Sequence, residues 1–221
     1  MFVSVAIDGP AGAGKSTISK IVAKKLNYLY VDTGSLYRTI AYVILNKGIN
    51  PNEIQKVIQE LSNINIEIKY IAGEQQVFLN HRNVSDFIRT SQISVAASVI
   101  AAIPDIRFFL LELQHKIAEN NDVIMDGRDI GTVVLPNATV KLFLSASDEK
   151  RAERRYRQSC RRGEDIAYDV ILSEIRQRDY NDRNRELAPL KQAENAILID
   201  TSELSLEDSV QAVYAAIIAN K

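Results

Sequence analysis

The chain has 221 residues, of which 46% are hydrophobic and 25% charged, and its formal net charge is −1. These values are typical of one globular domain and provide no overall attraction to nucleic acid or to an anionic membrane. The only cysteine is Cys160, which excludes an intrachain disulfide and a cysteine metal cage, and the two histidines, His81 and His115, lie too far apart in sequence to favour a histidine-rich metal site.

Two further features bear on location. The opening MFVSVAID has no basic leader and too short an apolar stretch for a signal peptide. The most apolar region, residues 94–113, is interrupted by Pro104, Asp105 and Arg107, so it does not read as a membrane span. We expect a cytoplasmic protein without a membrane segment.

The predicted elements alternate along the chain. Short runs rich in Val, Ile and Leu are typical of strands buried on both faces, and longer amphipathic or charged segments between them are typical of helices. Lys47-Gly48 is a plausible helix stop, Pro104 a good first-turn residue, and Ser205 with Asp208 resembles a capping box. Strands and helices that alternate in this way predict an α/β fold with a parallel sheet. In chain order we expect a strand at 3–8, helix 15–26, strand 29–32, helix 35–47, helices 92–102 and 104–119, strands 123–126 and 140–144, helices 148–161 and 168–187, strand 196–200, and a last helix opening at Ser205.

Residues 64–84 break this rhythm. The segment INIEIKYIAGEQQVFLNHRNV alternates apolar and polar residues and carries Gly73 at a turn-like position. This pattern predicts a small antiparallel meander inserted into the α/β core. The residues alone fit a surface hairpin and a substrate-binding role equally well.

The segment Gly9–Ser16, GPAGAGKS, matches the phosphate-binding pattern G-x-x-x-x-G-K-[ST] and lies between a predicted strand and a predicted helix. Glycines allow backbone N–H groups to turn toward an anion, and the positive end of the following helix points to the same place. Lys15 adds a positive charge for the β- and γ-phosphates, and the Ser16 hydroxyl can bind Mg²⁺. The segment therefore predicts a P-loop that binds a nucleoside triphosphate.

The rest of the chain narrows the reaction. It has no N-K-x-D element for guanine, and its size fits a kinase of a small metabolite. Arginine binds phosphate bidentately, and Arg38 in DTGSLYR and Arg128 in DGRDIGT both follow predicted strands. Ligands of open α/β sheets bind at the edge where the parallel strands end, so these two arginines are candidates for binding the acceptor.

Two charged segments allow two interpretations each. Arg178, Asp182 and Arg185 have the spacing of one helical face, which fits either a surface ion-pair stripe or a row of groups facing a nucleotide. Residues Arg151, Arg154 and Arg155 share another face. The chain lacks a wide basic surface with interleaved aromatics, so a lid over the triphosphate explains this cluster better than RNA binding.

Four motifs in order, DGPAGAGKST, DTGSLYR, DGRDIGTVV and RDYNDRNRELAPL, resemble those of bacterial cytidylate kinases (CMP/dCMP kinases), members of the nucleoside monophosphate kinase family, and the resemblance covers nearly the whole chain. It implies a single P-loop kinase domain over residues 1–221, with a five-stranded parallel sheet, flanking helices, a monophosphate-binding insert at about 60–90 that contains the meander, and a helical lid at about 148–170. Thr33 stands where many relatives carry Ser and keeps the hydroxyl.

The resemblance also implies roles for individual residues. Lys15, Arg128, Asp129 and Arg185 would be catalytic, and Ser16 would bind Mg²⁺. Arg38, Arg128 and Arg185 would grip the acceptor phosphate, while Ser98, Arg107 and Asp129 would read cytosine and Arg178 and Asp182 would hold the sugar. The ATP-binding set would be Gly9, Pro10, Ala11, Gly12, Ala13, Gly14, Lys15, Ser16, Thr17 and Arg154, and the CMP-binding set Thr33, Arg38, Ser98, Arg107, Arg128, Asp129, Arg178, Asp182 and Arg185.

The predicted reaction is ATP plus CMP or dCMP giving ADP plus CDP or dCDP, with Mg²⁺, in pyrimidine nucleotide metabolism. We expect a monomer that binds neither nucleic acid nor membrane. Asp126, at the end of VIMD, fits either orientation of water around Mg²⁺ or a loop cap. A P-loop kinase for UMP or a non-nucleotide metabolite, and a non-catalytic nucleotide-binding regulator, are the alternatives to this prediction.

Overall fold

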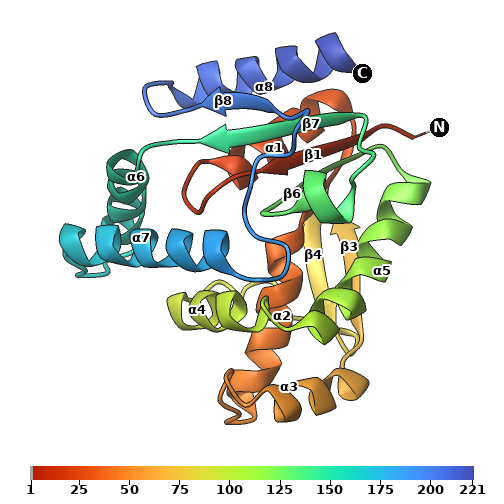
Figure 1. The fold of residues 1–221 in the computed structure, drawn as a ribbon, viewed down its shortest axis with the longest axis vertical. Coiled ribbons are helices and arrows are strands. Elements are labelled where there is room, and N and C mark those ends of the chain that lie inside the picture. Colours follow the sequence, from red (N-terminus) through yellow and green to blue (C-terminus); the bar gives the residue numbers. More distant parts are fainter. Residues whose placement is uncertain (1) are drawn as a thin grey trace. The chain divides into compact units, whose positions relative to one another are not determined.

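The computed structural model describes residues 2–221. These residues form two compact units: unit 1 contains the chain up to Leu29 and Asn121–Lys221, and unit 2 is Tyr30–Asn120 (Figure 1).

The larger sheet has five strands among residues 2–221, in the order β2-β6-β1-β7-β8. β1 pairs in parallel with β6 and β7, and β7 pairs in parallel with β8. The backbone N–H of Leu29, where β2 begins, donates to the Asp122 carbonyl just before β6 over 2.8 Å. This sheet confirms the predicted parallel α/β core. Its strands are β1 (Ser4–Asp8), β2 (Leu29–Asp32), β6 (Val123–Gly127), β7 (Val140–Ser145) and β8 (Ile197–Asp200).

The helices of unit 1 are α1 (Lys15–Leu26), α6 (Asp148–Arg161), α7 (Tyr168–Asn184) and α8 (Leu206–Asn220), with a π-helical turn, η2, at Ile130–Val134. α1 and α8 pack against one another, and α6 packs on α7 around Ala152, Ile171 and Ile175. The Ser205 hydroxyl accepts a 3.0 Å hydrogen bond from the Asp208 N–H at the start of α8, which confirms the predicted cap.

Unit 2 is built around α2 (Thr33–Asn46). Its buried face, which includes Leu36, Ile40 and Ile44, joins one apolar cluster with Ile100 and Leu110. Figure 1 shows α2 with α4, α5 and the small sheet around it. The other elements are α3 (Ile54–Glu60), a 3₁₀ turn η1 (Leu61–Asn63), β3 (Ile66–Ile71), β4 (Glu74–Leu79), β5 (Arg82–Asn83), α4 (Ser91–Ile100) and α5 (Pro104–Asn120).

The small sheet of unit 2 is the predicted antiparallel meander. β4 pairs antiparallel with both β3 and β5. Ala72 and Gly73 have φ angles of 53° and 77° in the tight turn between β3 and β4, which is the turn position expected for Gly73. α3 was not predicted, because its seven residues are too few to establish a helical period.

Within residues 2–221, no single helix is long and apolar enough to cross a membrane; only α4 and α5 taken together, bent by 102° at their junction, have that length and composition.

Candidate active site

The P-loop follows β1 with a backbone that requires glycine. Gly9, Gly12 and Gly14 have φ angles of 147°, 80° and 88°. A Cβ added at Gly9 would lie 2.0 Å from the Leu144 carbonyl oxygen, so a side chain there would collide with β7. The loop therefore turns sharply while it stays pressed against the end of the sheet.

Three carbonyl groups of the loop are held by donors. The Lys15 ammonium donates to the Pro10 carbonyl over 2.8 Å, and Arg151 Nη1 donates to the Ala11 carbonyl over 2.9 Å. The Thr201 hydroxyl donates to the Ala13 carbonyl over 3.2 Å. With these carbonyls engaged, the loop amides and the start of α1 form a surface suited to an anionic phosphate.

Lys15 is buried, with 6% of its surface exposed. Burial, and next the charge of Arg128, lower the pKa of its ammonium to about 7, while Asp126 and Asp8 oppose the change. A polyanion in the loop would favour the charged ammonium. A phosphate bound in the loop would therefore raise the pKa of Lys15 and keep its ammonium charged.

The hydroxyl of Ser16 donates to Asp126 Oδ2 over 2.7 Å. Asp126 lies in β6, level with Ile7 of β1, and is buried. Among residues 2–221, no three His, Cys, Asp or Glu side chains gather as a metal-ligand set. A hydroxyl beside a carboxylate nevertheless fits Mg²⁺, which is usually bound by one or two protein oxygens, substrate phosphates and water.

Asp8 joins the P-loop strand to the segment that follows β6. Its two carboxylate oxygens accept hydrogen bonds of 2.7 Å from the N–H groups of Ile130 and Gly131, directly after Arg128 and Asp129. Burial raises the pKa of Asp8 to about 6, against the lowering effect of these two bonds. Asp8 was not predicted as a site residue, although its position between the first strand and the P-loop was a usable signal.

Several predicted acceptor residues meet in unit 1. Arg128 Nε lies 2.9 Å from Asp182 Oδ2, and Arg185 Nη2 lies 3.4 Å from Asp129 Oδ1. Burial alone would lower the pKa of Arg128, but Asp182 holds it above its ordinary value. Burial would raise the pKa of Asp182, but Arg128 and Arg178 hold it below its ordinary value. Arg128 and Asp182 are therefore both charged and orient one another.

Arg185 lies just outside α7, which corrects the expected helix over 168–187. α7 ends at Asn184, and Arg185 has φ −65° and ψ 140°. The chain then turns back, since Ala188 has a φ of 51° and the Leu190 N–H donates to the Asp182 carbonyl over 2.7 Å. The predicted helical face therefore holds only for Arg178 and Asp182.

The three arginines of α6 have different partners. Arg151 is only 1% exposed and its Nη2 lies 2.5 Å from Asp179. Arg154 donates to the hydroxyl and the carbonyl of Thr201, and Arg155 forms a 2.9 Å ion pair with Glu174. The helical face predicted from the spacing thus includes Arg151, which is buried and holds the P-loop through the Ala11 carbonyl.

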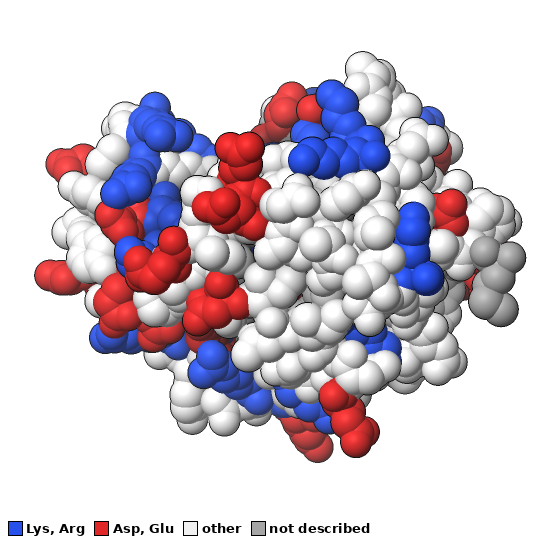
Figure 2. All heavy atoms as spheres, turned by 90° about the horizontal axis from the view of Figure 1, so that it is seen from above, with Lys and Arg blue, Asp and Glu red and all other residues white. Residues whose placement is uncertain are grey.

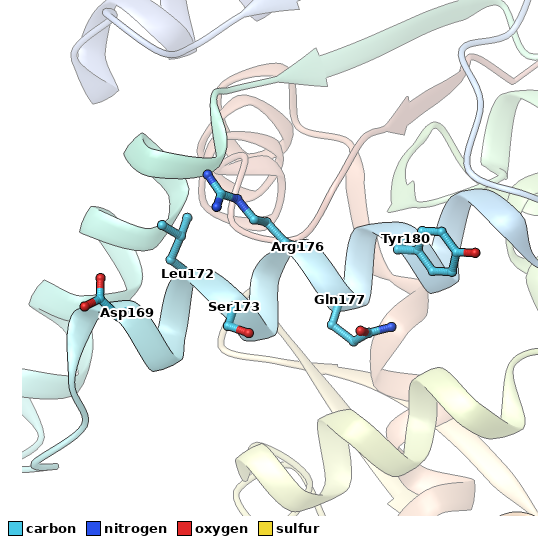
Figure 3. A pocket seen from close by; sticks show the side chains of 6 residues that line it. All are labelled: Asp169, Leu172, Ser173, Arg176, Gln177 and Tyr180. Atoms are coloured by element: carbon cyan, nitrogen blue, oxygen red, sulfur yellow. The ribbon is translucent and has the colours of Figure 1, made fainter.

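A separate surface cavity of about 520 Å³ lies along α7. Figure 3 shows its side chains in a row on that helix. Arg178 and Asp182, the two predicted site residues on α7, do not line this cavity. It is lined by Asp169, Leu172, Ser173, Arg176, Gln177 and Tyr180.

The remaining predicted residues lie in unit 2. Thr33 is buried and begins α2. Arg38 lies in the second turn of this helix, and its Nη2 donates to Asp32 Oδ2 over 2.6 Å. Arg107 is buried in α5, donates to the Ala101 carbonyl over 3.1 Å and lies 5.8 Å from the ring of Tyr37. Ser98 is partly buried in α4.

A P-loop on a five-stranded parallel sheet, with a buried lysine and strand-end carboxylates, defines the class of P-loop proteins that bind nucleoside triphosphates. Three solved structures share this fold. An uncharacterized protein from Eubacterium ventriosum has a TM-score of 0.55 at 11% identity, covering 98% of this chain and 99% of that one. Shikimate kinase from Bacteroides thetaiotaomicron has a TM-score of 0.50 at 16% identity, covering 98% of each chain, and a gluconokinase from Sinorhizobium meliloti has a TM-score of 0.50 at 14% identity, covering 98% and 92%. At these identities the likeness establishes the fold alone.

Sequence comparison identifies the family. The sequence model of the cytidylate kinase family matches residues 5–219. The chain is 48% identical over 211 residues to a cytidylate kinase from Caldicellulosiruptor saccharolyticus, covering 96% of this chain and 93% of the relative. It is 49% identical over 216 residues to a cytidylate kinase from Leuconostoc mesenteroides, covering 98% and 96%. The chain belongs to the cytidylate kinase family and is a phosphotransferase.

Proposed function

We propose that the protein transfers the γ-phosphoryl group of ATP to CMP or dCMP, giving ADP and CDP or dCDP. The observation that carries the proposal is the buried Lys15 in the glycine-rich P-loop of a chain of the cytidylate kinase family. Lys15 lies close enough to Arg128, which is paired with Asp182, for the charge of Arg128 to lower the pKa of Lys15. The donor phosphate would lie in the P-loop.

The nucleophile would be a phosphate oxygen of CMP, which is largely ionised near neutral pH. No general base is then required, and catalysis consists of positioning and charge neutralisation. Lys15 would stabilise the γ-phosphoryl group in flight. Ser16 and Asp126 would hold Mg²⁺, which when bound supplies further neutralisation at the phosphates.

The acceptor roles come from the family resemblance. In this proposal Arg38, Arg128 and Arg185 bind the CMP phosphate, and Thr33 contacts the substrate. The base is read by Ser98, Arg107 and Asp129, and the sugar is held by Arg178 and Asp182. Residues at about 60–90 form the monophosphate-binding insert, and residues at about 148–170, with Arg154, form the lid of a single kinase domain.

The remaining proposals concern partners and location. We place the protein in the cytoplasm as a monomer that binds ATP and CMP or dCMP and does not bind nucleic acid or membrane. On the face that Figure 2 draws, Lys and Arg lie in separate groups with Asp and Glu near them, so this face offers no continuous basic surface. A nucleic-acid site is expected to be a continuous basic surface.

The test is a coupled ADP-release assay with ATP and Mg²⁺ across all ribo- and deoxyribonucleoside monophosphates. We expect the highest kcat/KM with CMP and dCMP. Turnover with UMP alone would contradict the proposed acceptor, and absence of turnover with every monophosphate would contradict a kinase of nucleotides. Folded Lys15→Ala is the control for contaminating kinases.

A further inference from the structure

Gln75, the second residue of β4, contacts the junction between β2 and α2, and all these residues lie in unit 2. Its Oε1 accepts a 2.7 Å hydrogen bond from the Asp32 backbone N–H. Its Nε2 donates to the Ser35 hydroxyl oxygen over 2.9 Å and to the Asp32 carbonyl over 3.4 Å. Both ends of one neutral amide are therefore used on the junction.

Asp32 in turn holds Arg38. One carboxylate oxygen of Asp32 caps α2 by accepting from the Ser35 N–H over 3.1 Å, and the other accepts from Arg38 Nη2 over 2.6 Å. A Cβ at Gly34 would lie 3.1 Å from Arg38 Nη1 and 3.2 Å from Asp32 Oδ1, so the turn is closely packed around this pair. A change in the Asp32 backbone would move the carboxylate that orients Arg38.

The meander contacts the same segment a second time. The Tyr70 hydroxyl on β3 donates to the Tyr30 carbonyl over 2.9 Å. Burial raises the pKa of Tyr70 to about 12, so the hydroxyl stays a donor across the neutral range. The sheet is therefore tied to the residues that precede α2 from two of its strands.

We propose that Gln75 is a positioning residue of the acceptor site: it fixes Asp32, and Asp32 holds Arg38 in the orientation that binds the CMP phosphate. This inference rests on the proposed function. It gives the meander a role in substrate binding through the β2–α2 junction, without contact between Gln75 and substrate.

The test is Gln75→Glu with Gln76→Glu as matched control. Glu at position 75 keeps the size but replaces the Nε2 donor with an oxygen that faces the Asp32 carbonyl and the Ser35 hydroxyl oxygen. Gln76 is the next residue of β4, and its Oε1 accepts from Asn83 over 3.1 Å. The control thus makes the same chemical change at the neighbouring position, with β5 instead of the junction as its partner.

We expect Gln75→Glu to raise KM for CMP by about 10-fold, because a carboxylate oxygen would replace the Nε2 donor in the part-buried contact with the Asp32 carbonyl and the Ser35 hydroxyl. KM for ATP should stay within about 2-fold of wild type, because unit 1 carries the P-loop. Gln76→Glu should match the wild type. In the Arg38→Met background, adding Gln75→Glu should cause little further change, because Gln75 acts through Arg38.

An unchanged KM for CMP in folded Gln75→Glu, an equal rise in KM for ATP, or an equal effect of Gln76→Glu would each overturn the inference. If Gln75→Glu does not fold, the pair Gln75→Met and Gln76→Met, which introduces no charge, decides by the same KM values. A wild type that does not phosphorylate CMP would overturn the proposed function and this inference together.

Discussion

Replacing Asp8 with asparagine should change how the stability of the protein depends on pH. Asp8 is 3% exposed, and its carboxylate accepts from the N–H groups of Ile130 and Gly131, both over 2.7 Å. Burial raises its pKa from 3.8 to about 6. The folded state therefore binds this proton more tightly than the unfolded state does.

The sign and size follow from that difference. The stabilisation by the protonated carboxyl is complete below pH 3.8 and is lost as the pH rises through about 6. Since one pKa unit corresponds to about 1.4 kcal/mol, the full contribution is about 3 kcal/mol. Asparagine does not titrate, so the free energy of unfolding of Asp8→Asn minus that of wild type should rise by most of this amount between about pH 4 and pH 7.

A constant penalty accompanies this change. The asparagine oxygen can accept from one N–H, but its amide nitrogen would face the other, which costs about 1–3 kcal/mol at every pH. The pH dependence of the difference, and not its absolute value, therefore carries the test.

The assay is urea unfolding of both proteins across this pH range at constant ionic strength. Asp200→Asn is the control, because hydrogen bonds from the hydroxyl and N–H of Ser202 lower the pKa of Asp200 below its ordinary 3.8; this carboxylate stays ionised across the range, so the difference between Asp200→Asn and wild type should change little with pH. A difference between Asp8→Asn and wild type that does not vary with pH would refute the reasoning.

Three further predictions concern chemistry, base choice and bracing. Lys15→Ala should lower kcat by about 100- to 1,000-fold with little change in KM for CMP; near-normal turnover in a folded variant would disprove the P-loop mechanism. Asp129→Ala should lower kcat/KM for CMP more than for UMP, because a carboxylate can accept from the cytosine amino group but not pair with uracil O4; an unchanged CMP/UMP ratio would show that Asp129 does not read the base. Arg151→Met should lower the free energy of unfolding by about 3–5 kcal/mol, since it leaves Asp179 buried without its cation. The partly exposed pair of Arg155 should contribute less than about 1 kcal/mol, and equal losses in urea unfolding for Arg151→Met and Arg155→Met would contradict this assignment.

Much of the fold was predictable because its signals are local. β1 is an apolar run that is buried along nearly its whole length, β7 alternates buried and partly buried residues, and α1 spans the predicted residues 15–26 because a glycine turn precedes it. α2 begins at Thr33, two residues earlier than predicted, because the Asp32 side chain caps it. A cap formed at the last residue of a strand is easily assigned to the strand alone.

The contacts that organise the candidate site were less predictable because they join residues distant in sequence. Asp8 meets Ile130 and Gly131 across 122 and 123 positions. The spacing of Arg151 with Arg154 and Arg155 indicates a helical face, but burial behind the P-loop depends on where α6 packs. No local pattern carries that information.

The arginines assigned to the acceptor phosphate share one arrangement within their own units. In unit 1, Arg128 is paired with Asp182 and Arg185 with Asp129, and in unit 2 Arg38 is paired with Asp32. Partly or fully buried pairs of this kind add little net stability, because desolvation offsets the attraction between the charges. These pairs do fix the orientation of each guanidinium group.

A guanidinium has five N–H donors, and a single carboxylate does not use all of them. Each arginine can therefore stay paired with its aspartate and still donate hydrogen bonds to a phosphate. Donors aligned in advance need little reorganisation when charge develops during phosphoryl transfer. The acceptor phosphate supplies its own nucleophilic oxygen, so orientation is the main task left to the protein. We therefore propose that Asp32, Asp129 and Asp182 also orient the arginines with which they pair, in addition to the substrate contacts proposed for Asp129 and Asp182, and that Gln75 acts on Arg38 one step further from the substrate.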